Sequence, residues 1–285
     1  LLDSLRRGDA QINLTADRAT LDAAAPWADA FVAETLAAAP SAPAPATATT
    51  ANKTGVAAWN ESWSKDFATA ATQQPRSEGF AVTTQVNYVT LGGQLFAPGE
   101  RVSGATSVVQ RWLSRGFLWD NVRVVGGAYG GSCSFSPYSG RILFSSYRDP
   151  NLEGTIDTYF GAAEQLAGLS QGGLSEEALT QAIVGAVGDL DTPMTAEQRG
   201  GAAFRWRTAG ETDESRQQWR DEVLSTTAKD FEEFGERLRS VFDANQVGVA
   251  VFGSSDSLQR ARDTLAESRG IDLNIRDMNS KSSAK

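Results

Sequence analysis

Histidine is missing from all 285 residues of the chain, and cysteine occurs only once, as Cys133. Without an imidazole the chain cannot supply the histidine ligands or the histidine bases on which many hydrolytic sites depend. A single cysteine excludes an internal disulfide and any metal site built from several cysteines. The single cysteine therefore indicates a reducing compartment, or at least a protein that makes no use of oxidation.

Long apolar runs and positive charge are also scarce. No stretch approaches the roughly 18 apolar residues that a membrane-spanning helix needs. Lys and Arg total 26 against 35 for Asp and Glu, which gives a formal charge of -9. This balance disfavours phosphate backbones and anionic lipid, so we expect neither nucleic acid nor membrane partners. The 41% hydrophobic content is sufficient for a substantial core.

The N-terminal third is divided by a linker-like segment. Residues 41–50 read SAPAPATATT, a composition that cannot build a core. We therefore expect three parts: residues 1–38 as the C-terminal end of a preceding α+β domain, 39–77 as a linker, and 78–285 as a last domain. The chain does not begin with Met, so we expect a processed protein or an internal piece of a longer one.

The two ends of the chain share a pattern of strand, polar cap and helix. Residues 12–15 alternate like a short strand, and Asp17 is placed to cap a helix that ends before Pro40. Residues 247–252 form an apolar strand that precedes a helix over 258–268. The repetition favours two related domains, of which the first is represented by its end.

Between these ends, strand signals precede helix signals. Phe80, Val82, Val86 and Tyr88 predict one strand with imperfect alternation. Residues 102–114 predict a helix. Residues 132–136 and 141–147 predict a hairpin with its turn at 137–140, in which Cys133 and Phe135 share one face and three serines the other.

The second half of the last domain reads as helical. Asp149, followed by Pro150, predicts the start of a helix, and Thr195 with Gln198 matches a capping box. An apolar stripe behind Thr227 predicts a further helix; it comprises Phe231, Phe234, Leu238, Val241 and Phe242. Strands followed by helices, with a hairpin present, favour the α+β class over a parallel doubly wound sheet.

The segment GGAYGGS, with Arg123 shortly before Tyr129, carries the clearest chemical signal. A glycine-rich phosphate cradle is one interpretation, but no Lys-Ser/Thr follows and the next element looks like a strand. Alternatively Gly126 and Gly127 relieve crowding at a bend while Tyr129 packs on a neighbour. Residues six apart on a straight strand are roughly 20 Å from each other. Arg123 and Tyr129 can serve one ligand only if the glycine pair bends the chain.

The stretch VRVVGGAYGG…YSG…SYRDPNLEGTIDTYFGAAEQL closely resembles the last domain of the presequence proteases, in the pitrilysin-like family of zinc metallopeptidases. QINLTAD, TQVNYV, LWDNVRV, AIVGAVGDLDTP and EVLSTTAKDFEEFGE match the same pattern in order. The resemblance implies an α+β domain with a mixed, mainly antiparallel sheet packed by helices. It also implies a peptidase whose two halves close around a chamber.

In that family the N-terminal half holds zinc with an inverted His-x-x-Glu-His motif. The resemblance implies that this chain is the opposite half, so that Zn would be bound by the N-terminal half and no metal by this chain. An Arg and a Tyr from the C-terminal half reach the zinc site in the resembling enzymes. The matching positions are Arg123, which would bind the substrate backbone, and Tyr129, which would stabilise the oxyanion.

The other notable residues have structural interpretations. Cys133 is expected to be a buried hydrophobe, and Arg148 with Asp149 to orient the helix that follows. Tyr138 is expected at the surface or lining the chamber. Ser134 and Ser136 have no base nearby in the sequence, which disfavours a serine nucleophile. An acidic run is expected on a solvated helix face; it comprises Asp230, Glu232, Glu233 and Glu236.

The functional prediction is the C-terminal half of a metalloendopeptidase that degrades short unstructured peptides, such as cleaved presequences. Its expected partners are the N-terminal half and the peptide substrate, and alone it should be inactive. The expected location is the chloroplast stroma, the mitochondrial matrix, or both. The rival hypothesis is a non-catalytic subunit of the same fold, which would bind a partner in a larger complex.

Overall fold

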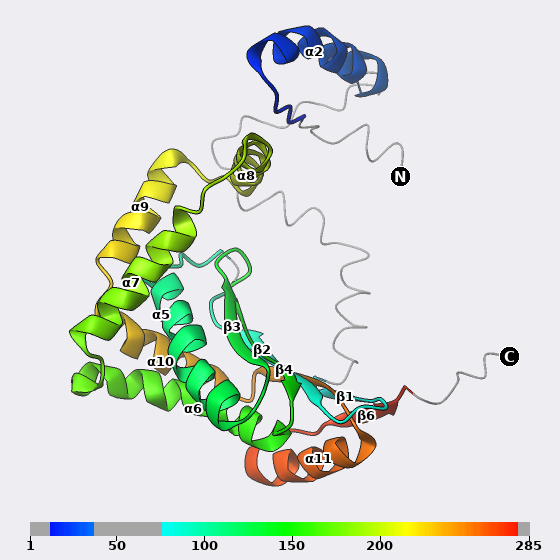
Figure 1. Cartoon of the computed structure of the whole chain (residues 1–285), viewed down its shortest axis with the longest axis vertical. Helices are drawn as coiled ribbons and strands as arrows, with labels where there is room; N and C mark the ends of the chain where they lie inside the picture. The colour runs from blue at the N-terminus through cyan, green and yellow to red at the C-terminus, as the bar shows by residue number, and fades with distance from the viewer. Residues whose placement is uncertain (1–11, 37–75, 98, 279–285) are drawn as a thin grey trace, which may run out of the picture. The chain divides into compact units, whose positions relative to one another are not determined.

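The computed structural model describes residues 12–36, 76–97 and 99–278, which fall into two units. Within the described residues, one unit contains 12–36 with 192–215, and the other contains 76–191 with 216–278. Figure 1 shows the elements of both. The expected linker at 39–77 lies outside the described residues except for its last two positions. The three-part division therefore stays a prediction.

The second unit is built around a six-stranded sheet, in the order β3-β4-β2-β5-β1-β6 (Figure 1). Its strands are β1 (Glu78–Ala81), β2 (Asn87–Gln94), β3 (Gly130–Ser136), β4 (Arg141–Asp149), β5 (Val247–Gly253) and β6 (Asn274–Asp277). The pairs β3–β4, β4–β2 and β2–β5 are antiparallel, and β5–β1 and β1–β6 are parallel. The predicted α+β class with a mixed, mainly antiparallel sheet is confirmed.

Helices of the second unit connect and cover the strands. They are α5 (Ala105–Trp112), α6 (Leu152–Gly168), α7 (Glu176–Leu190), α10 (Ala228–Asp243) and α11 (Ser255–Arg269), with π-helical segments η2 (Leu113–Phe117), η3 (Trp119–Val125) and η4 (Leu169–Gly173). The helix α9 (Asp213–Leu224) begins in the first unit and ends in the second. The hairpin, the stripe of α10 and the C-terminal strand and helix lie where the sequence predicts them.

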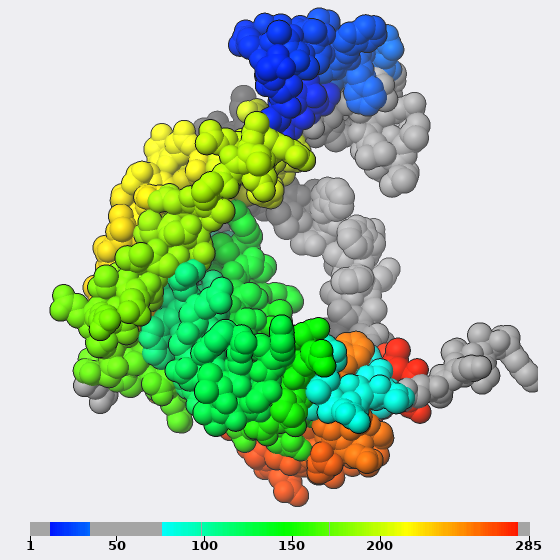
Figure 2. Space-filling view, viewed as in Figure 1, coloured from blue at the N-terminus to red at the C-terminus, as the bar shows by residue number. Residues whose placement is uncertain are grey.

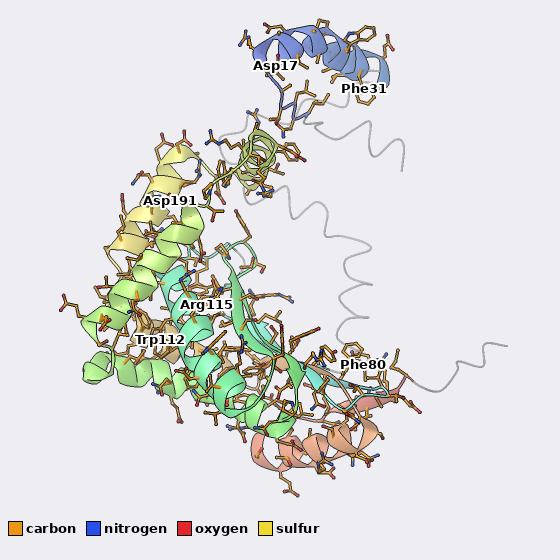
Figure 3. The ribbon with its side chains drawn as sticks, in the orientation of Figure 1. Asp17, Phe31, Phe80, Trp112, Arg115 and Asp191 are labelled. Atoms are coloured by element: carbon orange, nitrogen blue, oxygen red, sulfur yellow. The ribbon has the colours of Figure 1, made fainter. Side chains whose placement is uncertain are left out.

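The prediction of one strand over residues 80–88 is wrong, because two strands occupy this stretch. A turn at 82–86 separates them, and the Thr84 hydroxyl stabilises it by donating to the Val86 carbonyl at 3.1 Å. β1, which carries Phe80 (Figure 3), then pairs with β5 and β6, whereas β2 pairs with β4 and β5. Figure 2 shows this cyan region at the surface beside α11 in orange.

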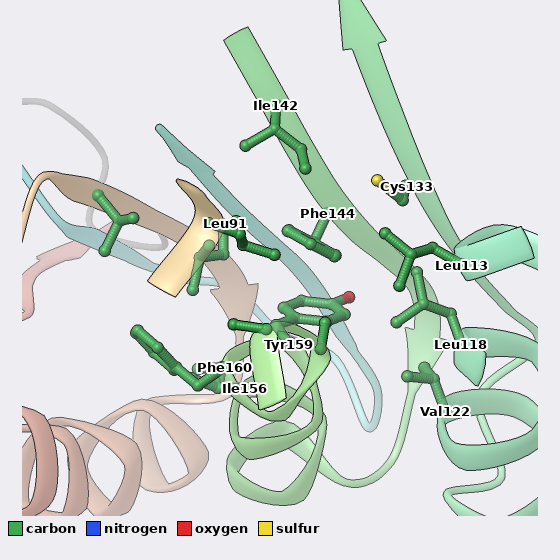
Figure 4. Close-up of a cluster of buried hydrophobic side chains, with 14 of the residues drawn as sticks. Leu91, Leu113, Leu118, Val122, Cys133, Ile142, Phe144, Ile156, Tyr159 and Phe160 are labelled. Carbon is green, nitrogen blue, oxygen red and sulfur yellow. The ribbon is translucent and has the colours of Figure 1, made fainter. Parts of the chain in front are cut away.

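One face of the sheet forms the core. Leu91 on β2 and Ile142 and Phe144 on β4 point from the strands toward α6, and the Phe144 ring stacks on Tyr159 at 5.3 Å (Figure 4). Burial raises the pKa of the Tyr159 hydroxyl, so the side chain stays neutral in this apolar layer. Burying side chains of this size stabilises the fold by about 1.5–3 kcal/mol each.

The junction between β4 and α6 differs from the expected helix cap. Asp149 is the last residue of β4, and the N-cap of α6 is Asn151. Asp149 is fully buried, and its carboxylate accepts the backbone N–H of Asn151 at 2.8 Å. Its carbonyl accepts the side-chain amide of Asn87 at 2.9 Å. Asp149 thus orients the chain entering α6 without being its cap, and Arg148 is exposed with a φ of 51°.

Three helical segments lie wholly within the described residues of the first unit. These are α2 (Arg18–Phe31), its π-helical extension η1 (Val32–Leu36) and α8 (Ala196–Ala209). Asp17 caps α2 by accepting from the Thr20 N–H at 2.9 Å, and Phe31 ends it (Figure 3). The capping box at Thr195 is confirmed by hydrogen bonds in both directions with Gln198.

The expected strand at residues 12–15 is wrong: the segment pairs with no strand in the part of the chain that the structure describes. Asn13 instead donates to the Gly200 carbonyl at 2.9 Å. A strand needs a neighbouring backbone for its ladder, and alternation in the sequence cannot provide one. None of the described residues of α2 is buried.

Candidate substrate-binding site

Arg123 and Tyr129 lie at one end of the sheet and are joined by a tight bend. Arg123 belongs to η3, and Tyr129 immediately precedes β3. Gly126 ends η3 by donating to the Asn121 carbonyl at 2.9 Å, and Gly127 donates to the Arg123 carbonyl at 3.1 Å. The bend that the sequence required between the two residues is present.

The two glycines are needed for different reasons. A Cβ on Gly126 would lie 2.7 Å from the Val122 carbonyl oxygen, which is too close for any side chain. Gly127 has a φ of 80°, in the left-handed region that costs other residues about 1–2 kcal/mol. Since both glycines shape the bend, they position the site through the backbone.

The Arg123 side chain is held between two aromatic rings. Its guanidinium carbon lies 4.1 Å from the centroid of the Trp119 ring and 5.8 Å from that of Tyr129. Such cation–π contacts contribute about 0.5–1 kcal/mol at exposed sites and restrict the side chain. Arg123 is half-buried and keeps its charge, so its N–H groups can donate to a carbonyl of a ligand.

Tyr129 presents its side chain to solvent. The side chain is 68% exposed, while the backbone N–H is fixed by donating to the Tyr147 carbonyl at 3.0 Å. The ring of Tyr147 meets that of Tyr129 edge to face at 5.8 Å. A phenol remains a hydrogen-bond donor at neutral pH. The arrangement therefore places a guanidinium beside an exposed phenol ring.

Two contributors to this geometry, Trp119 and Tyr147, were not predicted from the sequence. Tyr147 had a usable signal, since a hairpin turn between Ser136 and Arg141 places Tyr147 opposite Gly130, as observed. Trp119 lies four residues before Arg123, a separation that brings helical side chains together. Neither signal indicates an orientation toward a ligand.

The remaining candidates lie apart from this pair. Cys133 is buried, and burial raises the pKa of its thiol, which keeps it protonated and unreactive. Ser134 is exposed on the face opposite Cys133. Tyr138 is exposed in the hairpin turn, at the far end of β3 from Tyr129. In the acidic run, Asp230 accepts the Thr227 N–H at 2.8 Å and so caps α10.

No group of three or more His, Cys, Asp and Glu side chains that could hold a metal ion occurs among the described residues. The complete sequence also lacks histidine. The residues present therefore do not fit a zinc site of the kind that the resemblance implies. Across the same described ranges, no helix is long and apolar enough to cross a membrane.

Solved structures share this fold at low sequence identity. A protease from Helicobacter pylori aligns with a TM-score of 0.50 and 13% identity, covering 62% of this chain and 43% of the other. A conserved protein from Enterococcus faecalis V583 aligns with a TM-score of 0.50 and 14% identity, covering 64% of this chain and 43% of the other. The class of the chain is thus an α+β domain found in larger proteins.

The family is defined more closely by sequence. The profile of the PreP C-terminal domain matches residues 77–254, and the chain belongs to this family. Presequence protease 1, chloroplastic/mitochondrial, of Arabidopsis thaliana is 41% identical over 181 residues, which are 64% of this chain and 16% of the plant protein. The mitochondrial presequence protease of Aspergillus fumigatus is 34% identical over 138 residues, 48% of this chain and 12% of that protein.

A bacterial relative, protein HypA of Clostridium perfringens, is 27% identical over 188 residues, covering 66% of this chain and 19% of that protein. The match thus spans less than a fifth of the length of these curated relatives. The resemblance to presequence proteases seen in the sequence is confirmed.

Proposed function

We propose that this chain is the C-terminal part of a zinc metalloendopeptidase that degrades short unstructured peptides such as cleaved presequences. The observation that carries the proposal is the placement of Arg123 beside the exposed Tyr129 in a member of the PreP C-terminal domain family. The names of the plant and fungal relatives support presequences as substrates and an organellar location, in chloroplasts or mitochondria.

Each of the two residues has a distinct task in this proposal. Arg123, held over Trp119, donates to a backbone carbonyl of the peptide and fixes its register. Tyr129 donates its hydroxyl to the oxygen of the scissile carbonyl as negative charge develops there. A donor of this kind contributes about 10²–10³ to kcat, because it binds the transition state more strongly than the substrate.

The metal chemistry belongs to another part of the complete protein. Because the residues of this chain do not fit a zinc site, zinc and the groups that activate water would come from the N-terminal half. That half and the peptide are the partners that the proposal requires. This chain alone should show no peptidase activity.

The test is Tyr129→Phe in the complete protease. We expect kcat to fall about 10²–10³-fold while KM changes little, because the variant loses only a hydroxyl that acts in the transition state. Tyr138→Phe is the matched control: Tyr138 is similarly exposed, at 65%, but lies at the other end of the hairpin. Initial rates on a quenched fluorescent peptide measure both variants.

Normal turnover by the Tyr129→Phe variant would refute the catalytic role. If instead the unmodified complete protein lacks both peptidase activity and zinc, the non-catalytic interaction subunit becomes the better description. Metal analysis of the complete protein separates these two results.

A further inference from the structure

Tyr129 is the first of five aromatic side chains that cross the sheet in a line. This aromatic row consists of Tyr129 before β3, Tyr147 on β4, Tyr88 on β2, Phe252 on β5 and Phe80 on β1. Ring centroids are 5.8 Å apart for the first pair, 5.4 Å for Tyr147 and Tyr88, and 4.7 Å for Phe252 and Phe80. The sequence of rings follows the order of the strands in the sheet.

The strand registers explain this alignment. Tyr147 on β4 lies opposite Gly130, which follows Tyr129 in the chain. Phe252 on β5 lies opposite Tyr88 on the neighbouring β2 and opposite Phe80 on the neighbouring β1. Antiparallel and parallel neighbours therefore bring residues from distant parts of the chain to the same end of the sheet. The row therefore contains two groups of rings in contact, which the pairing of Tyr88 with Phe252 places side by side.

The row is on the face of the sheet opposite the core. Tyr147, Tyr88 and Phe252 are 50%, 38% and 44% exposed, whereas their chain neighbours Ser146, Val89 and Val251 are buried under the helices. A substantial part of each of these rings is therefore accessible to a ligand. Adjacent exposed aromatic residues of this kind mark sites that bind a partner or ligand.

The chemistry of the surrounding face favours an uncharged occupant along most of the row. The positions next to the row from β3 to β5 are neutral, namely Thr90, Ser132, Leu143, Ser145 and Ala250. At the β1 end, Arg276 on β6 lies opposite Phe80 and forms an ion pair with Glu78. Positive charge lies at the end near β3 and β4, where Arg123 and the exposed Arg148 flank Tyr129 and Tyr147. This end can accept peptide carbonyl groups but repels basic side chains.

The dimensions of the row fit an extended peptide. Five neighbouring strands span about 19 Å at a spacing of about 4.8 Å, which equals five to six residues of extended chain at about 3.4 Å each. Alternate side chains of such a segment point to one side, so about three of them would meet the rings. The row begins at Tyr129, so a peptide lying on it would also reach the candidate site.

We propose that the aromatic row binds apolar side chains of the peptide on one side of the bond to be cleaved, and so determines a preference for apolar, uncharged segments there. The inference rests on the proposed function, because it places the same peptide against Arg123 and Tyr129. Tyr147 and Tyr88 are the specificity-determining residues, since both are exposed and lie nearest to Tyr129.

The experiment uses the complete protease and two peptides that differ only at three alternate positions, which are Phe in one and Ser in the other. Tyr147→Ala and Tyr88→Ala should lower kcat/KM for the Phe peptide about tenfold or more and leave the Ser peptide within about threefold. Thr90→Ala, on the same face outside the row, should change neither peptide. Tyr147→Phe should retain the preference, because the ring and not the hydroxyl makes the contact.

Binding is measured separately by fluorescence anisotropy of the labelled Phe peptide on protease stripped of zinc by a chelator. Loss of affinity in the row variants, with normal affinity in Thr90→Ala, supports the proposal that the aromatic row binds the peptide. If the row variants bind and cleave both peptides as the unmodified protein does, the inference is overturned, as it is if Thr90→Ala loses the preference equally. A complete protein without peptidase activity, together with lost Phe-peptide binding in the row variants, would refute the proposed function and leave the row standing as a peptide-binding surface.

Discussion

The two faces of the sheet use the same strands for different purposes. Along β4, Ile142 and Phe144 point into the core, whereas Leu143 and Tyr147 point away from it. On the covered face each side chain is constrained by close packing against α6 and its neighbours. On the open face the side chains of the aromatic row are partly exposed, and its first ring also contacts Arg123. The comparison suggests that one face determines whether the chain folds and the other what it binds.

The largest difference is expected between Phe144→Ala and Tyr147→Ala, which truncate aromatic rings on opposite faces of β4. Phe144 is fully buried against Tyr159, so its removal leaves a cavity and should lower the free energy of unfolding by about 3–5 kcal/mol. Tyr147 is half-exposed, and its loss should cost about 1 kcal/mol or less. Urea unfolding of both variants measures the two costs. Equal costs would show that the open face also holds the fold together.

A smaller effect on stability is expected at the bend between Arg123 and Tyr129. Gly127→Ala forces an alanine into a φ of 80° and should cost about 1–2 kcal/mol. The methyl group itself would meet only Pro150, at an ordinary 3.4 Å, so the cost is conformational. Relaxation of the bend should also separate Arg123 from Tyr129 and lower kcat/KM.

Gly130→Ala is the control for this change, because a Cβ there meets nothing within 4 Å and Gly130 has no positive φ. Thermal unfolding and initial rates of the complete protease compare the two variants. If Gly127→Ala is as stable and active as Gly130→Ala, the left-handed glycine is not what positions Tyr129.

Local patterns predicted the fold where neighbouring residues determine it. The serine and apolar alternation of β3, the cap at Asp17 and the stripe of α10 needed no knowledge of distant contacts. The predictions that are wrong concern the pairing of strands. Residues 12–15 alternate without a partner strand among the described residues, and residues 80–88 divide between two ladders.

The candidate site was only partly predictable for the same reason. The resemblance to a family singled out Arg123 and Tyr129, and the glycine pair explained how they could meet. The register of the hairpin could have added Tyr147. Phe252 and Phe80 join the row only because β5 inserts between β2 and β1, a strand order that no local pattern indicates.

The smallest effect should come from the outer surface of the helices, which takes no part in either face. Arg220 donates to both carboxylate oxygens of Asp191 at 2.6 Å, and these hydrogen bonds hold the pKa of Asp191 below its usual value. A lowered pKa in the folded state stabilises the protein above the unfolded pKa of about 4, and this contribution is lost as pH falls through the folded value. Asp191→Asn should therefore be slightly less stable than the unmodified protein at pH 7, and this difference should be smaller at pH 3. Thermal unfolding at both pH values, in a double-mutant cycle with Arg220→Gln, isolates the pair. A difference in stability that is as large at pH 3 as at pH 7 would mean that Asp191 acts through packing and not through its charge.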